Sequence, residues 1–191
     1  MNRFSILVVC AVLLSLPSVA ASDKMEHYVS TEISPDQVAV YSYILKSYRT
    51  LLKPTYRDML AKAFYLEEET QPLDLKELKP GRGCLKGLDL ERIPTDQAPT
   101  VHRLSEQKWL PSYVKLTRGA PCKGSPQDGL CSETEGTLSL TEIAFDKSHT
   151  HALVGFGVRC GLQCGWEQVI VLEKVKGRWQ RTNRVCGEWY I

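Results

Sequence analysis

Two cysteines in the segment RCGLQCGW, residues 159–166, have the clearest chemical potential in this sequence. Cys160 and Cys164 could form a redox pair, half of a zinc site or a disulfide across a β-turn. A thioredoxin-type pair has two intervening residues and lies at a helix N-terminus, which lowers the pKa of the first thiol. Here three residues intervene, and the apolar segment that follows is typical of a strand. The spacing therefore favours a structural disulfide, with the following glycines permitting a tight turn.

A zinc site is the second alternative for these thiols. His149 and His151, together with Cys160 and Cys164, would supply four ligands of the types that zinc prefers. Both histidines, however, lie in or beside a predicted hairpin turn, where polar residues are common in any case. Export to an oxidising compartment also favours oxidation of the thiols over metal binding. We therefore expect no metal and no cofactor.

Three adjacent glutamates offer a different chemistry. Glu67 and Glu69 would share one face of a strand, and paired carboxylates can act as acid and base in glycoside cleavage. Charged residues at the end of a strand are usually solvated, which favours a structural interpretation. His102 has no nucleophile near it in the sequence, although a triad built from distant residues stays open. The nucleophile-elbow, zinc-protease, P-loop and dinucleotide motifs do not occur.

The sequence therefore assigns no catalytic residue, and whether the protein is an enzyme stays open. Candidate ligand contacts are Arg159 and Trp166, which flank the two cysteines, and Glu67 and Glu69. The formal net charge is +2, and removing Arg3 with a signal peptide lowers it by one. Nucleic-acid binders usually carry a basic face or tract, and no long one is present. We expect an unknown macromolecular or small ligand and no nucleic acid.

The N-terminal residues predict export. An apolar run at residues 4–16 follows a basic residue, and small residues suited to signal peptidase follow it. Cleavage after Ala20 or after Ala21 fits equally well. The run is about 13 residues long, against about 20 for a membrane-spanning helix, and no later run is long enough. We expect a signal peptide at 1–21, a single domain at 22–191 without a membrane span, and a secreted or periplasmic location.

The cysteine content agrees with export. Of the seven cysteines one lies in the expected signal peptide, which leaves an even number for disulfides. The candidates are Cys84, Cys122, Cys131, Cys160, Cys164 and Cys186. Local spacing favours Cys122–Cys131, which brackets a loop rich in turn residues, and Cys160–Cys164. An alternative pairs one of the latter two with Cys186.

The elements that position these residues can be predicted in part. Ser34 and Gln37 form a capping box, and the apolar stripe that follows predicts an amphipathic helix of about 18 residues that ends at Pro54. The stripe consists of Val38, Tyr41, Leu45, Tyr48 and Leu52. Strands are expected within 62–70 and at 113–117. The proline-rich stretch 71–100 is expected to be irregular.

Short helical turns are expected inside that irregular stretch, at 73–78 and 88–92. From residue 136 the alternation of apolar residues predicts four strands, with a β-bulge in the first one, where the alternation shifts phase. Lys176 and Gly177 predict a tight hairpin turn before the last strand. We expect an α+β fold in which the N-terminal amphipathic helix packs on an antiparallel β-meander of about four to six strands, held by disulfides.

The C-terminal part resembles a group of uncharacterised exported bacterial proteins that share the pattern C-G-x-x-C-G followed by V-L-E-K-x-x-G-x-W. The matching residues are Ser139, Phe145, Asp146, Ala152, Leu153, Val154, Cys160, Gly161, Cys164, Gly165, Val171, Leu172, Glu173, Lys174, Gly177, Trp179 and Trp189. Residues 41–48 and 64–70 also resemble the group, so the likeness covers about half of the mature chain. The resemblance implies export and the meander, and it implies no activity.

These observations predict a non-catalytic binding or inhibitor-like module of the cell envelope whose ligand is unknown. The prediction rests on the absence of catalytic motifs, the small size and the disulfide-bonded sheet. The alternative is a small secreted hydrolase with an unrecognised carboxylate or histidine site. A cleft that holds Glu67, Glu69 or His102 would favour the hydrolase.

Overall fold

The computed structural model describes residues 28–62, 64–75, 78, 83–90, 100–105, 107–118, 122–123, 133–134, 136–159 and 165–190. The expected signal peptide lies outside the described residues. So do Cys131, Cys160 and Cys164, and with them both favoured disulfides.

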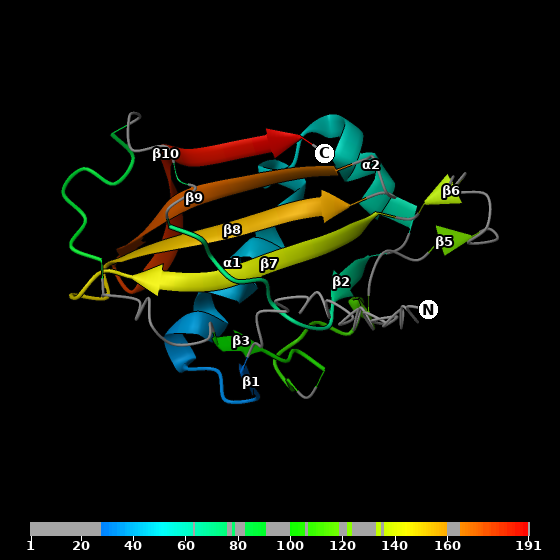
Figure 1. The fold of residues 1–191 in the computed structure, drawn as a ribbon, viewed down its shortest axis with the longest axis horizontal. Helices are drawn as coiled ribbons and strands as arrows, with labels where there is room; N and C mark the ends of the chain where they lie inside the picture. The colour runs from blue at the N-terminus through cyan, green and yellow to red at the C-terminus, as the bar shows by residue number, and fades with distance from the viewer. Residues whose placement is uncertain are drawn as a thin grey trace, which may run out of the picture.

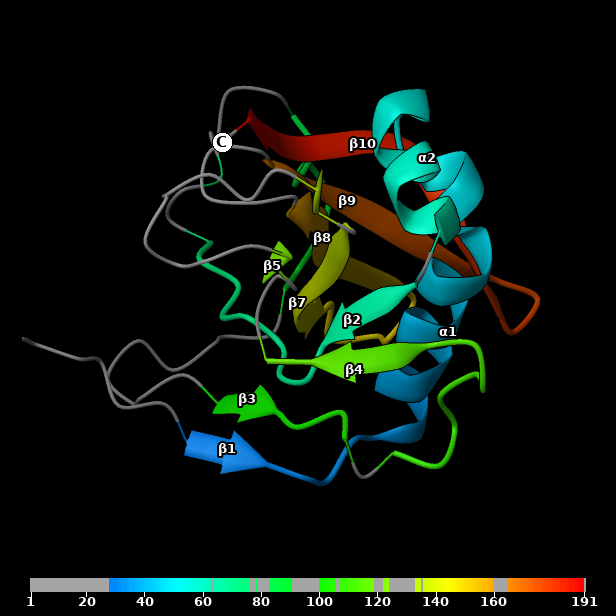
Figure 2. The same ribbon diagram turned by 90° about the vertical axis from the view of Figure 1, so that its right-hand side faces the viewer.

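Two helices cover one face of a sheet (Figures 1 and 2). The first helix, α1, spans Pro35–Leu51, and the second, α2, spans Pro54–Lys62. The Ser34 hydroxyl accepts a hydrogen bond from the Gln37 backbone N–H at 3.2 Å, and the Ser34 N–H donates to Gln37 Oε1 at 2.8 Å. This is the predicted capping box, which satisfies N–H groups at the start of α1.

The main sheet has six strands in the order β10-β9-β8-β7-β2-β4. The strands are β2 (Tyr65–Glu67), β4 (Lys115–Thr117), β7 (Thr137–Phe145), β8 (His151–Arg159), β9 (Gly165–Val175) and β10 (Arg178–Tyr190). β7 to β10 pair antiparallel in sequence order, so the expected four-strand meander is present. β2, however, pairs parallel with both β7 and β4, which corrects the expectation of a wholly antiparallel sheet. Long connections rather than hairpins join these three strands, and long connections allow parallel pairing.

Two small sheets lie beside the main one. β1 (Tyr28–Ser30) pairs parallel with β3 (Thr100–His102), and β5 (Cys122–Lys123) pairs antiparallel with β6 (Glu133–Thr134). The described residues within 73–78 and 88–92 form no helix, so the helical turns expected there are wrong for the part that can be described.

The two faces of the sheet carry separate cores. On the helix face, alternate residues of β8 pack against α1, as their spacing predicts. They are Ala152, Val154, Phe156 and Val158, which meet Val40, Tyr41, Ile44 and Leu45. On the opposite face, a smaller cluster joins Leu153, Val169 and Val171 to Leu78 and Cys84. The hydrophobic cover of this second face is therefore partial, and the rest of that face carries the cleft described below.

Candidate ligand-binding cleft

A bulge in β7 anchors the chain that leaves β2. The register of β7 against β8 shifts between Leu140 and Ile143, where the sequence predicts a bulge. The backbone of Gln71 forms hydrogen bonds with β7 at this bulge. Its N–H donates to the Leu140 carbonyl at 2.8 Å, and its carbonyl accepts from the Glu142 N–H at 2.7 Å. The chain after β2 then crosses the face of the sheet away from α1 (Figure 1). The bulge thus fixes one wall of a cleft.

Two glycines of β8 form the floor beside this wall. Gly155 and Gly157 point to the face away from α1, because the residues between them pack in the helix-side core. A Cβ at Gly155 would lie 2.5 Å from Thr141 Cγ2, and one at Gly157 would lie 2.5 Å from Glu167 Cγ. Both positions therefore need glycine for close packing of the neighbouring strands. Side chains of the neighbouring strands fill the space that a Cβ would need, with Thr141 against Gly155 and Glu167 against Gly157.

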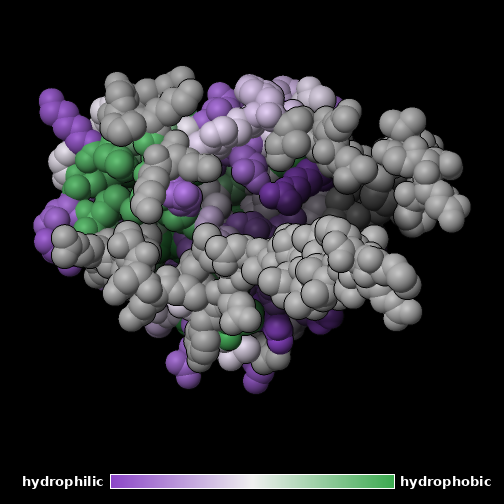
Figure 3. Space-filling model, in the orientation of Figure 1, coloured by the Kyte–Doolittle hydropathy of each residue, from purple (hydrophilic) through white to green (hydrophobic). Residues whose placement is uncertain are grey.

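Two adjoining cavities, together called the cleft from here on, lie on this face. The larger, of about 420 Å³, is lined by the end of β2 with Arg103 and Arg118. The smaller, of about 210 Å³, lies beside Gly155, between Arg159 and Trp189. Gln71 lines both. In Figure 3, which faces this surface, hydrophilic side chains gather around a hollow near the centre, and hydrophobic ones lie to its left.

Ion pairs between arginine and glutamate line the cleft. They join Arg118 Nε to Glu68 Oε2 at 2.5 Å, Arg103 Nη2 to Glu69 Oε1 at 3.0 Å, and Arg159 Nη2 to Glu167 Oε1 at 3.3 Å. At least one partner of each pair is partly exposed, so the pairs contribute little to stability. For ligand binding, these pairs matter because they hold charged groups in fixed positions around the open space of the cleft.

Glu67 differs from the other glutamates of the cleft. It is 8% exposed, and its Oε2 accepts a hydrogen bond from the Gln71 side-chain amide at 2.8 Å. Burial raises the pKa of Glu67 above its ordinary value, because desolvation disfavours the ionised form; Arg159 and Gln71 oppose this effect, and Glu167 adds to it. The cleft thus contains a buried carboxyl group next to paired charges.

Three of the four ligand-contact candidates predicted from the sequence lie together in the cleft. Glu67, Glu69 and Arg159 all line the cleft, although they come from two different strands and the bridge that follows β2. Trp166 is 1% exposed and stacks on Tyr56 of α2 with ring centroids 5.8 Å apart, so it lies in the helix-side core and not in the cleft. Sequence reasoning missed Arg103 and Arg118. The position of Arg118 directly after the strand expected at 113–117 was an available signal.

His102 lies outside the cleft in a buried ion pair. Its Nδ1 is 2.9 Å from both carboxylate oxygens of Glu142, and the Thr70 hydroxyl donates to the same carboxylate. The hydrogen bond to Glu142 raises the pKa of His102, and burial opposes it. Because the hydroxyl contacts the carboxylate and not the imidazole, this arrangement activates no nucleophile.

The zinc alternative is excluded by the strand that separates its ligands. His151 begins β8 and contacts Asp146 at 3.1 Å, while His149 contacts Asp36 at 3.2 Å. Cys160 directly follows the last of the nine residues of β8. At roughly 3.3 Å per residue, the ends of that strand are about 26 Å apart, so thiols and imidazoles cannot share one ion. No group of three or more potential metal ligands occurs among the residues that the structure describes.

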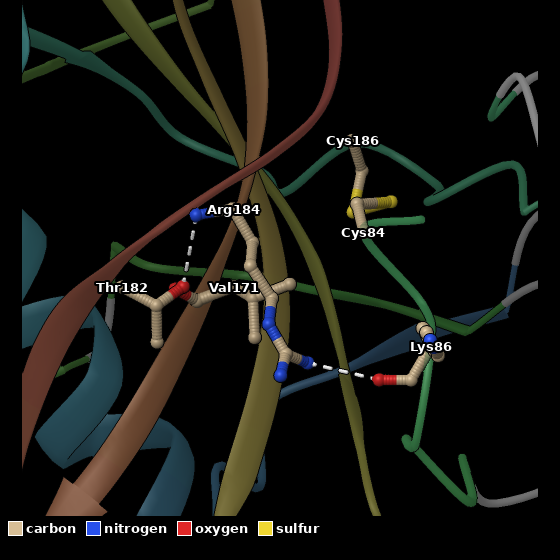
Figure 4. Close-up of a disulfide and its surroundings, with 6 residues drawn as sticks. All are labelled: Cys84, Lys86, Val171, Thr182, Arg184 and Cys186. Atoms are coloured by element: carbon tan, nitrogen blue, oxygen red, sulfur yellow. Dashed lines mark hydrogen bonds between the residues drawn. A yellow bond between two sulfur atoms is a disulfide. The ribbon is translucent and has the colours of Figure 1, made fainter. Parts of the chain in front are cut away.

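A disulfide joins Cys84 to Cys186, with the Cα atoms 5.3 Å apart (Figure 4). Both residues were candidates, but their pairing was not predicted, and it excludes the alternative in which Cys186 pairs with Cys160 or Cys164. Near it, Arg184 Nη1 donates to the Lys86 carbonyl at 3.1 Å. These contacts hold residues 83–90 against the strand β10 on the same face as the cleft.

Comparison of the chain with protein-family models, with curated proteins and with solved structures gives no match. Within the described ranges, no helix has the length and apolar character needed to cross a membrane. The chemistry of the cleft is therefore the basis for a proposal about function.

Proposed function

We propose that the protein is an exported, non-catalytic binding module of the cell envelope, and that the cleft holds its ligand. The observation that carries this proposal is that three arginine–glutamate pairs line the cleft. The pairs pre-organise charged groups, and a binding site gains affinity when its groups need little reordering. An inhibitor that presents this face to a target protein fits the same description.

The chemistry of the cleft favours a polar ligand. Arg103 directs its Nε and Nη2 donors to Glu69, and Arg118 directs its Nε donor to Glu68. Each guanidinium group has further N–H donors, which can bind carbonyl or carboxylate oxygens. A ligand with both hydrogen-bond acceptors and donors would therefore meet complementary groups along the cleft.

The described residues give no support to nucleophilic catalysis. The Ser139 hydroxyl, in the smaller cavity, donates to the Gly157 carbonyl at 3.5 Å and is not paired with a histidine. The ring of His102 is held by Glu142 outside the cleft. A nucleophile with a neighbouring base, which acyl transfer needs, is therefore not found in this part of the chain.

A hydrolase is the second candidate, and Glu67 is the observation that favours it. A buried carboxyl group with a raised pKa is typical of a general acid, and Glu167 is a second carboxylate of the same cleft. The Glu67→Gln variant separates the two functions. Loss of a hydrolytic activity found with the unmodified protein would favour the hydrolase.

Export is proposed on two observations. The N-terminal sequence has the pattern of a signal peptide with cleavage after Ala20 or Ala21, and the Cys84–Cys186 disulfide is typical of proteins outside the cytosol. We also propose that the protein is related to the exported bacterial proteins that its C-terminal pattern resembles. Cys122–Cys131 and Cys160–Cys164 are the disulfides we propose for the remaining cysteines.

Site-specific crosslinking tests the binding function. Pro72 lines the smaller cavity, and a photoreactive benzoylphenylalanine there would contact a ligand in the cleft. Lys46 is exposed on α1 and provides the matched control on the helix face. In an extract of the cell envelope, the label at 72 should give a product that excess unlabelled protein suppresses, and the label at 46 should not. Equal products from both positions, or products that resist competition, would contradict the proposal.

A further inference from the structure

The charges of the cleft are unbalanced at one position. Among the residues that the structure describes, its lining contains three arginines and four glutamates. Three of the glutamates each contact an arginine at 3.3 Å or less. Glu67 is the fourth, and among the described residues no cation lies within ion-pair distance of it. Within the described part of the chain, the neutral Gln71 amide donates the one hydrogen bond to its carboxylate, through Oε2, and Arg159 acts on it electrostatically from beyond ion-pair distance.

This imbalance has an energetic consequence. An ionised carboxylate that is 92% removed from solvent, as 8% exposure implies, is unfavourable unless a cation or several hydrogen bonds compensate it. A single amide hydrogen bond compensates only in part. Removing the partner from a buried ion pair is among the larger destabilising changes in proteins, so supplying a missing partner is correspondingly favourable. A ligand that brings a positive charge to Glu67 would complete the site.

We propose that the cleft binds a lysine or arginine side chain of a partner polypeptide, with its cationic group beside the Glu67 carboxylate. This inference rests on the binding function proposed above and adds the chemistry of the ligand. In the complex, the cleft would contain four charge pairs in place of three.

The shape of the cleft favours a polypeptide over a small amine. An amine would occupy only the surroundings of Glu67, whereas the two cavities extend from there past Gly155 to Trp189. A polypeptide chain can follow this length, and a small amine cannot. The remaining N–H donors of Arg103 suit the carbonyl oxygens of such a chain.

Peptide titration followed by nuclear magnetic resonance tests the inference. The reporters are the side-chain amide of Gln71 and the backbone amides of Gly155 and Gly157. The probes are Ac-Gly-Arg-Gly-NH2 and Ac-Gly-Lys-Gly-NH2, with Ac-Gly-Gln-Gly-NH2 as the neutral control and putrescine as the small amine. The protein variants are Glu67→Gln, which keeps the shape and can keep a hydrogen bond to Gln71, and Glu173→Gln, which removes an exposed glutamate of β9.

The cationic peptides should shift all three reporters and bind at least about tenfold more tightly than the neutral peptide, as expected for a hydrogen bond between charged groups. Glu67→Gln should weaken them by a similar factor, and Glu173→Gln should leave them unchanged. Equal binding of the neutral peptide, or full binding to Glu67→Gln, would overturn the cation assignment while the cleft remained a binding site. Putrescine binding as tightly as the peptides would overturn the polypeptide assignment. If no probe moves the reporters, the cation assignment fails, and crosslinking at position 72 decides separately whether the cleft binds a ligand.

Discussion

Glu142, on the bulge of β7, holds His102 of β3 with both carboxylate oxygens 2.9 Å from Nδ1. The same carboxylate accepts the backbone N–H of His102 at 3.0 Å. The next residue along the chain, Arg103, lines the cleft. This buried pair therefore connects the small β1–β3 sheet to the main sheet and fixes the position of one arginine of the cleft.

Replacing Glu142 by alanine should destabilise the fold strongly. The change leaves His102 and the Thr70 hydroxyl without their common acceptor. Removal of one partner from a buried ion pair costs about 3–5 kcal/mol, and this pair, with side chains 11% and 16% exposed, should lie at the lower end of that range. Urea denaturation measures the loss in the free energy of unfolding. Glu173→Ala, at an exposed position, is the control and should change it by less than about 0.5 kcal/mol. A loss for Glu142→Ala no larger than the control would show that the pair does not anchor β3.

The His102–Glu142 pair should also make stability depend on pH. The folded-state pKa of His102 is raised above 6.5, so the folded protein binds this proton more tightly than the unfolded chain. The stabilisation is fully present below pH 6.5 and is lost as the pH rises through the folded-state pKa. Denaturation midpoints measured on both sides of that range should fall with increasing pH. His102→Gln should remove this part of the dependence of the denaturation midpoint on pH. An unchanged dependence in the variant would show that other titratable groups cause it.

Glu67 should contribute a pH dependence of the same sign at lower pH. Its folded-state pKa is raised above 4.5, so ionisation of this buried group lowers stability as the pH rises from 4.5 through the folded-state value. Glu67→Gln, which is neutral at every pH, should be at least as stable as the unmodified protein at pH 7. Thermal denaturation at pH 4 and pH 7 provides the comparison. A clear destabilisation at pH 7 would mean that the carboxylate stabilises the fold in a way its surroundings do not explain.

Adding one methyl group at Gly157 should disturb the packing of β8 on β9. Gly157→Ala places a Cβ 2.7 Å from the Trp166 carbonyl oxygen and 2.5 Å from Glu167 Cγ. Overpacking of this kind costs about 1–3 kcal/mol. Asn183→Ala, at an exposed position of β10, is the control and should be nearly neutral. A stability of Gly157→Ala equal to that of the control would contradict the close packing of β8 on β9.

The Cys84–Cys186 disulfide should contribute more to the free energy of unfolding than a disulfide that closes a short loop. It closes a loop across 102 positions of the sequence, and the loop-entropy estimate for such a length is about 4–5 kcal/mol. Replacing both cysteines by alanine should lower the denaturation midpoint under oxidising conditions. It should also loosen residues 83–90, which hydrogen exchange can detect. Exchange rates in this segment that match those of the unmodified protein would show that the disulfide does not hold it.

The sequence predicted correctly those structural features that a few neighbouring residues determine. The capping box at Ser34, the bulge after Leu140 and the turn at Lys176 and Gly177 each depend on a few neighbouring residues, and all three are present. The parallel pairing of β2 with β7 was not predicted, because a strand of three residues carries too little periodicity to show its partner.

The site shows the same division between local and distant causes. Glu67 and Glu69 were candidates because alternate residues of a strand share one face, so that the two carboxylates would lie side by side. Arg103 pairs with Glu69 across 34 positions, and Arg118 pairs with Glu68 across 50. Contacts of this kind depend on how distant segments are brought together, and neither composition nor spacing encodes that. The pairing of Cys84 with Cys186 was missed for the same reason.

The most direct measurement combines the crosslink at position 72 with the two glutamine variants. Benzoylphenylalanine replaces Pro72 in the unmodified protein, in Glu67→Gln and in Glu173→Gln, and each is irradiated in the same envelope extract. A ligand held in the cleft by Glu67 predicts that the crosslinked product falls at least about tenfold in Glu67→Gln and is unchanged in Glu173→Gln. Equal yields from all three proteins would contradict this assignment, because the ligand would then bind without Glu67, the carboxylate of the cleft that forms no ion pair with a described residue.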